Sequence, residues 1–252
     1  MKRTILLVCA AIAVVSCKNK AENAKETATD EMVEETAMAK SSQEEWKVLF
    51  DGTSFNGWKG YLTDNVSDAW KIEDGAMVFH PPKEKVKGVS HNINTVDEYT
   101  DFVLSLEWKI SEAGNSGIFW GIKEDPKYKQ PYQTGPEIQV LDNDKHPDAK
   151  AGTTHQAGSL YDMVSPLKDV TRPVGEWNLI EISINHKTNY GKVVMNGMEI
   201  VEFPVKGDPW NQMVANSKFN GWEGFGKYTT GKIGLQDHGN EVAFRNIKIK
   251  EL

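Results

Sequence analysis

The sequence predicts an all-β domain, an antiparallel β-sandwich or jelly roll with few short helices. Its clearest segment is Asp101–Ile110, in which every second residue is apolar, as in a strand with one face in a core. Several other segments have the same period and are separated by turn-forming residues. Because no segment keeps a long helical period, these many short strands indicate two packed sheets.

The same period defines the individual strands. In chain order we predict strands over Ala69–Phe79, Asp101–Ile110, Ser116–Ile122, Glu137–Leu141, Trp177–Asn185, Gly191–Met195, Glu199–Phe203, Lys232–Gln236 and Glu241–Lys250. Asn196-Gly197 lies between two of them and is a dipeptide typical of a tight hairpin turn. The best candidate for a helix, or else an irregular loop, is the stretch Trp210–Phe219.

The first 17 residues have the pattern of an export signal. A basic start, Met1-Lys2-Arg3, precedes an apolar run from Ile5 to Val15 that is too short to span a membrane. The small residue before Cys17 resembles the bacterial lipoprotein cleavage box, which implies that Cys17 becomes the lipidated first residue. An ordinary signal peptide with a chance cysteine is the alternative. A lipidated chain is expected in the bacterial cell envelope, at the outer membrane, on its periplasmic or surface face.

Composition divides the rest of the chain in two. Residues 18–45 are rich in Ala, Glu, Lys and Thr and lack aromatic residues, so we expect a disordered acidic tether. Residues 46–252 are long enough for one domain with its own core. The net charge of −7 argues against a nucleic-acid partner. Because Cys9 lies in the segment to be removed, the mature chain has no cysteine pair for a disulfide.

The strand Glu137–Leu141 carries an unusual polar face. Side chains alternate along a strand, so Ile138 and Val140 point one way while Glu137 and Gln139 point the other. A carboxylate beside a hydrogen-bonding amide is what the floor of a cleft would present. A salt-bridged carboxylate on a solvated face is the alternative.

Eight segments, distributed in order along the domain, carry a family resemblance. They are Leu49–Trp58, Trp70–Gly75, Gly114–Phe119, Glu137–Asp142, Gly158–Tyr161, Gly175–Asn178, Gly231–Gly239 and Phe244–Ile249. From about Trp46 to its end the chain resembles the 3-keto-disaccharide hydrolase domain family. The resemblance implies a concanavalin-A-like fold, as in lectins and glucanases. Many members have Tyr-Arg where this chain has Trp120-Gly121, so a guanidinium that could grip a substrate is missing here.

Three more polar positions are site candidates. Glu107 lies opposite the apolar face of its strand, and would share a cleft with Glu137 if their strands were neighbours. Gln236 and His238 share a face where a strand meets a turn, and an imidazole suits a general base or a metal ligand. A surface Glu107 and a structural His238 are the alternatives. Glu137 and His238 are therefore the candidate metal ligands, with one divalent ion left open as a cofactor.

Substrate-binding candidates complete the set. Asn115 lies in a glycine-flanked loop and could bond sugar hydroxyls, although turn formation explains the loop equally well. Trp120 and Tyr161 are candidates for stacking on a sugar ring, with a place in the core as the alternative for each. The aromatic insert Pro204–Tyr228 is expected to wall the cleft.

The family resemblance implies a carbohydrate-active hydrolase that acts on 3-keto-glycosides. A ketone at C3 acidifies the C2 hydrogen, so a base can remove it, the C1 substituent can leave, and water can then add. We expect Glu137 or His238 as the base, with Gln139 or Asn115 stabilising the enediolate oxygen. The rival reading is a glycan-binding lipoprotein module without catalysis, and a conventional glycosidase is a weaker third.

Overall fold

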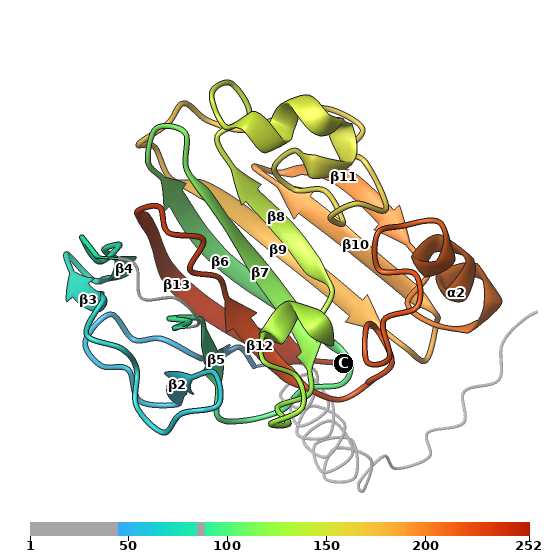
Figure 1. Cartoon of the computed structure of the whole chain (residues 1–252), viewed down its shortest axis with the longest axis horizontal. Coiled ribbons are helices and arrows are strands. Elements are labelled where there is room, and N and C mark those ends of the chain that lie inside the picture. Colours follow the sequence, from blue (N-terminus) through green and yellow to red (C-terminus); the bar gives the residue numbers. More distant parts are fainter. Residues whose placement is uncertain (1–44, 85–88) are drawn as a thin grey trace, which may run out of the picture. The chain divides into compact units, whose positions relative to one another are not determined.

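The computed structural model describes residues 45–84 and 89–252, and Figure 1 shows their course. The predicted signal peptide, the lipidation site Cys17 and all of the predicted tether except Glu45 lie outside the described residues. No helix in the described ranges is long and apolar enough to cross a membrane.

Strands dominate the described chain. They are β1 (Lys47–Val48), β2 (Trp58–Gly60), β3 (Trp70–Glu73), β4 (Ala76–Phe79), β5 (Ile93–Thr95), β6 (Phe102–Ile110), β7 (Asn115–Ile122), β8 (Glu137–Leu141), β9 (Asn178–Asn185), β10 (Tyr190–Met195), β11 (Met198–Phe203), β12 (Lys232–Leu235) and β13 (Val242–Glu251). Three 3-10 turns, η1 (Pro131–Gln133), η2 (Pro147–Ala151) and η3 (Thr153–His155), and the helix α2 (Gly207–Ala215) complete the elements seen in 45–84 and 89–252.

Two antiparallel sheets form a sandwich. Within the described residues an eight-stranded sheet runs in the order β11-β10-β9-β6-β13-β4-β3, with β1 paired to β13, and a five-stranded sheet runs β2-β5-β12-β7-β8. Figure 1 shows strands of the two sheets overlying each other in similar directions. The prediction of an antiparallel β-sandwich with few short helices is confirmed.

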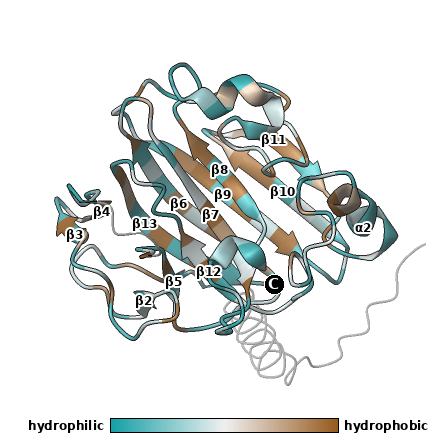
Figure 2. Cartoon of the chain, in the orientation of Figure 1, coloured by the Kyte–Doolittle hydropathy of each residue, from teal (hydrophilic) through white to brown (hydrophobic). Residues whose placement is uncertain are grey.

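The core lies between the sheets because their strands alternate. Ile138 and Val140 of β8 are fully buried in the same cluster as Leu104 and Leu106 of β6. The opposite faces of the same strands carry polar residues, and Figure 2 shows the resulting bands of brown and teal along the strands. Each sheet therefore has one dry face and one face available for other tasks.

Element boundaries agree with the expectations except in three places. The predicted strand Ala69–Phe79 is two strands, because Asp74 and Gly75 both have positive φ (49° and 75°) and form a tight turn. The helix α2 begins at Gly207 and ends at Ala215, whereas the predicted stretch was Trp210–Phe219; Asp208 and Pro209 suit a first helical turn, and the residues after Ala215 form turns. Strands β1, β2 and β5 are only two or three residues long, too short for a periodic signal.

Candidate active site

Strands β7 and β8 of the five-stranded sheet, and the segment that follows β12, build the site. The strands are neighbours in the order β12-β7-β8, and residues of β7 and β8 and Gln236, just after β12, line one pocket. Gly117 of β7 is paired with Gln139 of β8, and Phe119 with Glu137. Because Ile138 and Val140 are packed in the core, Glu137 and Gln139 must point outward, as the alternation predicts.

A cavity of about 380 Å³ opens on this face. It gathers most of the site residues expected from the sequence, together with four others. Its lining comprises Asn115, Tyr132, Glu137, Gln139, Tyr161, Lys218, Phe219, Trp222, Gln236 and His238. Segments far apart in the chain thus meet at one pocket, which makes it the candidate active site.

Glu137 lies at the buried end of the pocket and is 7% exposed. Its side chain lies over Gly117, where an added Cβ would come within 2.8 Å of Glu137 Cγ, so only glycine leaves room for it. Burial raises the pKa of the Glu137 carboxyl to about 8, with a further rise from Asp148, opposed by the Lys218 charge and a hydrogen bond from Gln236. The group can therefore hold a proton at neutral pH and exchange it near pH 8.

Amide side chains surround this carboxyl. Gln139 is 1% exposed, and its Oε1 accepts a hydrogen bond from Val140 N (3.1 Å), which fixes the side chain on the pocket wall. Asn115 Oδ1 and Gln236 Oε1 are buried and accept no hydrogen bond from the described residues. Because unpaired buried acceptors are costly, they are suited to donors brought by a ligand, such as sugar hydroxyls.

Tyr161 is held in the pocket by a segment that runs along β8. The backbone of this segment makes three hydrogen bonds with β8, from Gly158 N to Gln139 O (2.8 Å), from Gln139 N to Ser159 O (3.1 Å) and from Tyr161 N to Glu137 O (3.0 Å). The Tyr161 hydroxyl donates to Asp148 Oδ2 (2.9 Å). Its ring lies 4.6 Å from the His155 ring and 4.0 Å from Lys218 Nζ. These neighbours occupy the ring, so Tyr161 is poorly placed to stack on a sugar.

An aromatic wall closes another side of the pocket. Trp222 contacts Tyr132 (ring centroids 6.1 Å apart) and Phe219 (5.2 Å), and Phe219 stacks on Phe225 at 3.8 Å. Phe225 is buried beneath this wall and does not line the cavity. The expectation that the insert Pro204–Tyr228 walls the cleft is confirmed for Phe219 and Trp222.

His238 stands at the exposed rim of the pocket, where its ring meets that of His146 edge to face at 6.1 Å. Glu137 and His238 are the lining residues of a type that binds metals. Across residues 45–84 and 89–252, no three His, Cys, Asp or Glu side chains gather as a metal site. This part of the chain therefore offers no group of three such ligands for the divalent ion that the sequence left open.

Trp120 requires a correction. It alternates with Phe119 on β7 and faces the core, where it is 5% exposed and packs 5.7 Å from the Phe203 ring. The pocket lies on the opposite face of that strand, so Trp120 cannot stack on a sugar there.

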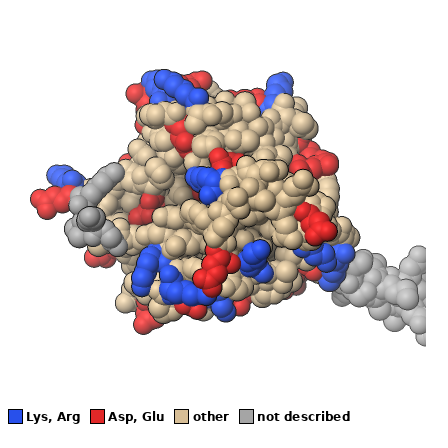
Figure 3. Space-filling view, turned by 45° about the vertical axis from the view of Figure 1, so that its right-hand side comes forward, with Lys and Arg blue, Asp and Glu red and all other residues tan. Residues whose placement is uncertain are grey.

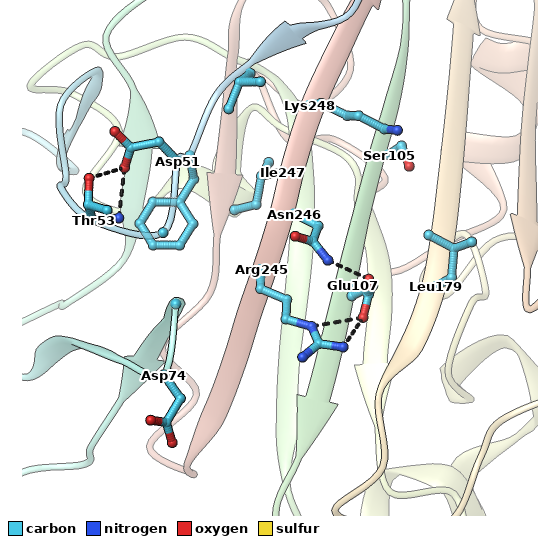
Figure 4. A pocket seen from close by; sticks show the side chains of 14 residues that line it. Asp51, Thr53, Asp74, Ser105, Glu107, Leu179, Arg245, Asn246, Ile247 and Lys248 are labelled. Carbon is cyan, nitrogen blue, oxygen red and sulfur yellow. Dashed lines mark hydrogen bonds and ion pairs between the residues drawn. The ribbon is translucent and has the colours of Figure 1, made fainter.

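Glu107 requires a second correction. Its strand β6 is paired with β9 and β13 in the eight-stranded sheet, not with β8. Glu107 faces a separate groove of about 880 Å³, where Figure 4 shows Arg245 and Asn246 directed at its carboxylate. Arg245 donates to it through Nε (2.9 Å) and Nη2 (2.6 Å), and Asn246 Nδ2 donates at 2.6 Å. The two glutamates thus lie on different surfaces.

Lys218 and Tyr132 are pocket residues that the sequence did not single out. Lys218 is an exposed turn residue between half-buried Ser217 and buried Phe219, and Tyr132 follows a proline in a short turn, so neither has a periodic or motif signal. Surface charge is no guide either, because Figure 3 shows acidic and basic side chains interspersed on the face in view. Only the folded chain brings these two residues to Glu137.

Comparisons with known proteins show which family the chain belongs to. Residues 45–250 match the family described as 3-keto-alpha-glucoside-1,2-lyase-like domain. A Bacteroides thetaiotaomicron protein named 3-keto-disaccharide hydrolase is 37% identical over 229 residues, covering 81% of this chain and 77% of that protein.

Two solved structures from Parabacteroides distasonis, both described as candidate glycosyl hydrolases, have the same fold. One has a TM-score of 0.76 at 34% identity, covering 83% of this chain and 95% of its own. The other has a TM-score of 0.64 at 27% identity, covering 82% and 100%. The family match over most of the chain, joined to these relatives, shows that the protein belongs to the 3-keto-alpha-glucoside-1,2-lyase-like domain family.

Proposed function

We propose that the protein cleaves 3-keto-glycosides, including 3-keto-disaccharides, by abstracting the C2 proton, expelling the C1 substituent and adding water. Family membership and the relative named 3-keto-disaccharide hydrolase support the substrate class. The observation that carries the chemistry is the buried carboxyl of Glu137, raised to a pKa of about 8 and surrounded by amides.

Glu137 is the base in this scheme. Its ionised form takes the proton from C2, and the electron pair moves into an enolate whose negative charge rests on the C3 oxygen. A pKa of about 8 makes this carboxylate a stronger base than an exposed glutamate, while about one molecule in ten remains ionised at pH 7. Gln139 and Asn115 line the same pocket and can donate amide hydrogens to the developing oxyanion.

The enolate then expels the C1 substituent, and a C1–C2 double bond forms. We assign to His238, which lines the pocket at its rim, the protonation of the departing oxygen and the later removal of a proton from the incoming water. Water adds at C1, the proton on Glu137 exchanges with solvent, Glu137 delivers a solvent-derived proton to C2, and the 3-keto sugar is released. The route needs one base and one acid rather than the two spaced carboxylates of ordinary glycosidases.

The test is sugar release from 3-keto-trehalose or a 3-keto-glucoside by the purified protein. We expect release from the ketone, one deuterium at C2 of the product formed in heavy water, and no cleavage of unoxidised trehalose. Cleavage of the unoxidised sugar would contradict the route. Binding without release would favour the glycan-binding alternative.

We also propose that Cys17 anchors the protein to the bacterial cell envelope, at the outer membrane, on its periplasmic or surface face. The support is the sequence pattern before Cys17. Labelling of cells with radioactive palmitate should mark the wild type but not Cys17→Ser. Equal labelling of both forms would overturn the anchor.

A further inference from the structure

One cation faces the candidate active site. Among the described residues that line the pocket, Lys218 is the only lysine or arginine. Its Nζ lies 4.0 Å from the centre of the Tyr161 ring, a cation–π contact that holds the ammonium against one wall. The positive charge of Lys218 acts on the Glu137 carboxyl, because it lowers the pKa of Glu137 while burial raises it.

The position of Lys218 is fixed by a chain of hydrogen bonds behind the pocket. Lys218 N donates to Asp162 Oδ2 (2.6 Å), and Asp162 Oδ1 lies 3.0 Å from His155 Nε2. His155 Nδ1 lies 2.8 Å from Asp148 Oδ1, and Asp148 Oδ2 accepts from the Tyr161 hydroxyl. The network therefore holds both the backbone of Lys218 and the ring beneath its ammonium.

Asp148 stays ionised within this network. Burial works against ionisation of Asp148, but hydrogen bonds from His155 and Tyr161, with the charges of His155 and Lys218, lower its pKa overall. Burial and the Asp148 hydrogen bond raise the pKa of the Tyr161 phenol, which remains a neutral donor. The network is thus a stable support and leaves the Lys218 charge to act in the pocket.

We propose that Lys218 is a catalytic residue that stabilises the enolate oxygen at C3, and that Asp162 is a positioning residue for it. This proposal rests on the proposed function, because the enolate forms only if Glu137 removes the C2 proton. As that proton leaves, negative charge moves to the C3 oxygen. A fixed ammonium beside a buried carboxyl is a stronger partner for that charge than the neutral amides alone.

Lys218→Met is the main test, with Lys227→Met as the matched control. Lys227 lies in the same insert, is exposed and does not line the pocket. We expect Lys218→Met to lower kcat on a 3-keto-glucoside by about 10² to 10³, with KM changed less than about threefold. Lys218→Arg keeps the charge and should recover part of the loss. Asparagine tolerates the positive φ of 60° at position 162, so Asp162→Asn should keep the backbone conformation. It should lower kcat about tenfold, because it weakens the contact that positions Lys218.

Two readouts separate catalysis from mere structure. Lys218→Met should move the rising limb of the kcat/KM profile to higher pH, because the loss of the charge raises the pKa of Glu137. It should also slow C2 hydrogen exchange of 1,5-anhydro-3-keto-glucitol in heavy water, a ketone with no group to expel at C1. Lys227→Met should alter neither.

The outcomes are distinguishable. If the wild type releases no sugar from any 3-keto-glycoside, the proposed function fails, and the role of Lys218 fails with it. If the wild type is active but Lys218→Met matches Lys227→Met in kcat, pH profile and exchange, the role of Lys218 is overturned while the function stands.

Discussion

Glu137 and Glu107 both lie on the outward face of a strand in the same sandwich, yet their surroundings are opposite. Glu137 is 7% exposed and faces a pocket in which two amide oxygens accept no hydrogen bond from residues 45–84 or 89–252. Glu107 is bound on both oxygens, by Arg245 on one and Asn246 on the other. A carboxylate whose acceptors are all occupied stabilises a fold, whereas a buried carboxyl with a raised pKa is available for proton transfer.

A β-bulge causes much of this difference. In β13 the register with β6 shifts between Arg245 and Lys248, and Asn246 takes a φ of 53°. The extra residue allows two neighbours in the chain to face the same carboxylate, which a regular strand would forbid. On the other sheet Gly117 has no side chain, which leaves room for the Glu137 side chain beside it. Local features of the backbone, the bulge in β13 and Gly117 in β7, therefore decide which glutamate is held in an ion pair and which faces the pocket.

The largest expected effect contrasts the two carboxyls directly. Glu137→Gln should lower kcat/KM on a 3-keto-glucoside by about 10³ to 10⁴, since the amide cannot take a proton. Glu107→Gln should leave kcat/KM within about twofold, because the groove it faces is separate from the pocket. Steady-state kinetics of both variants against wild type gives the comparison. An equal loss in the two variants would remove Glu137 from the role of base.

The pH dependence of kcat/KM should follow the ionisation of Glu137. Because the ionised carboxylate is the base, kcat/KM should rise with pH and level off above pH 8, with activity at pH 6 about a hundredfold below the plateau. The wild type and Glu107→Gln should share this profile. A limb near pH 4.5 would show that the base is an ordinary carboxylate in the free enzyme.

The two glutamine substitutions should change the free energy of unfolding at pH 8 in opposite directions. Burial raises the pKa of Glu137 from 4.5 to about 8, so the folded state loses stability as pH rises through this window. Glu137→Gln should therefore raise the free energy of unfolding at pH 8, by about 1 to 3 kcal/mol, and leave it unchanged near pH 4. Glu107→Gln should lower it by about 1 kcal/mol through the weakened Arg245 contact. Urea unfolding at both pH values is the measurement, and a pH-independent Glu137→Gln effect would contradict the burial argument.

The sequence was most informative where periodicity operates. Alternation along β6 and β8 predicted which residues face the core, and the outward direction of Glu137 and Gln139 followed from it. The same alternation applied to β7 would have placed Trp120 on the inner face with Ile118. The stacking prediction for Trp120 was wrong because it did not apply this alternation.

Pairing between strands was beyond the sequence. Glu107 and Glu137 have the same local pattern, and only the strand order separates them into different sheets. Lys218 reaches the pocket through a loop whose backbone is bonded to Asp162, more than fifty residues earlier. Such loop contacts depend on tertiary packing, which leaves no local periodicity to read.

The smallest effect tests the aromatic wall against the opposite groove. Trp222 lines the pocket beside Tyr132, whereas Trp177 lies in a groove on the other sheet beneath Arg245 (4.1 Å). If the wall holds the second sugar ring, Trp222→Ala should raise KM for a 3-keto-disaccharide about fivefold to tenfold, with kcat little changed. The effect should shrink on a 3-keto-glucoside with a methyl aglycone, and Trp177→Ala should change neither constant. A fall in kcat without a rise in KM would instead show that Trp222 shapes the reacting geometry around Glu137 rather than binding the leaving sugar.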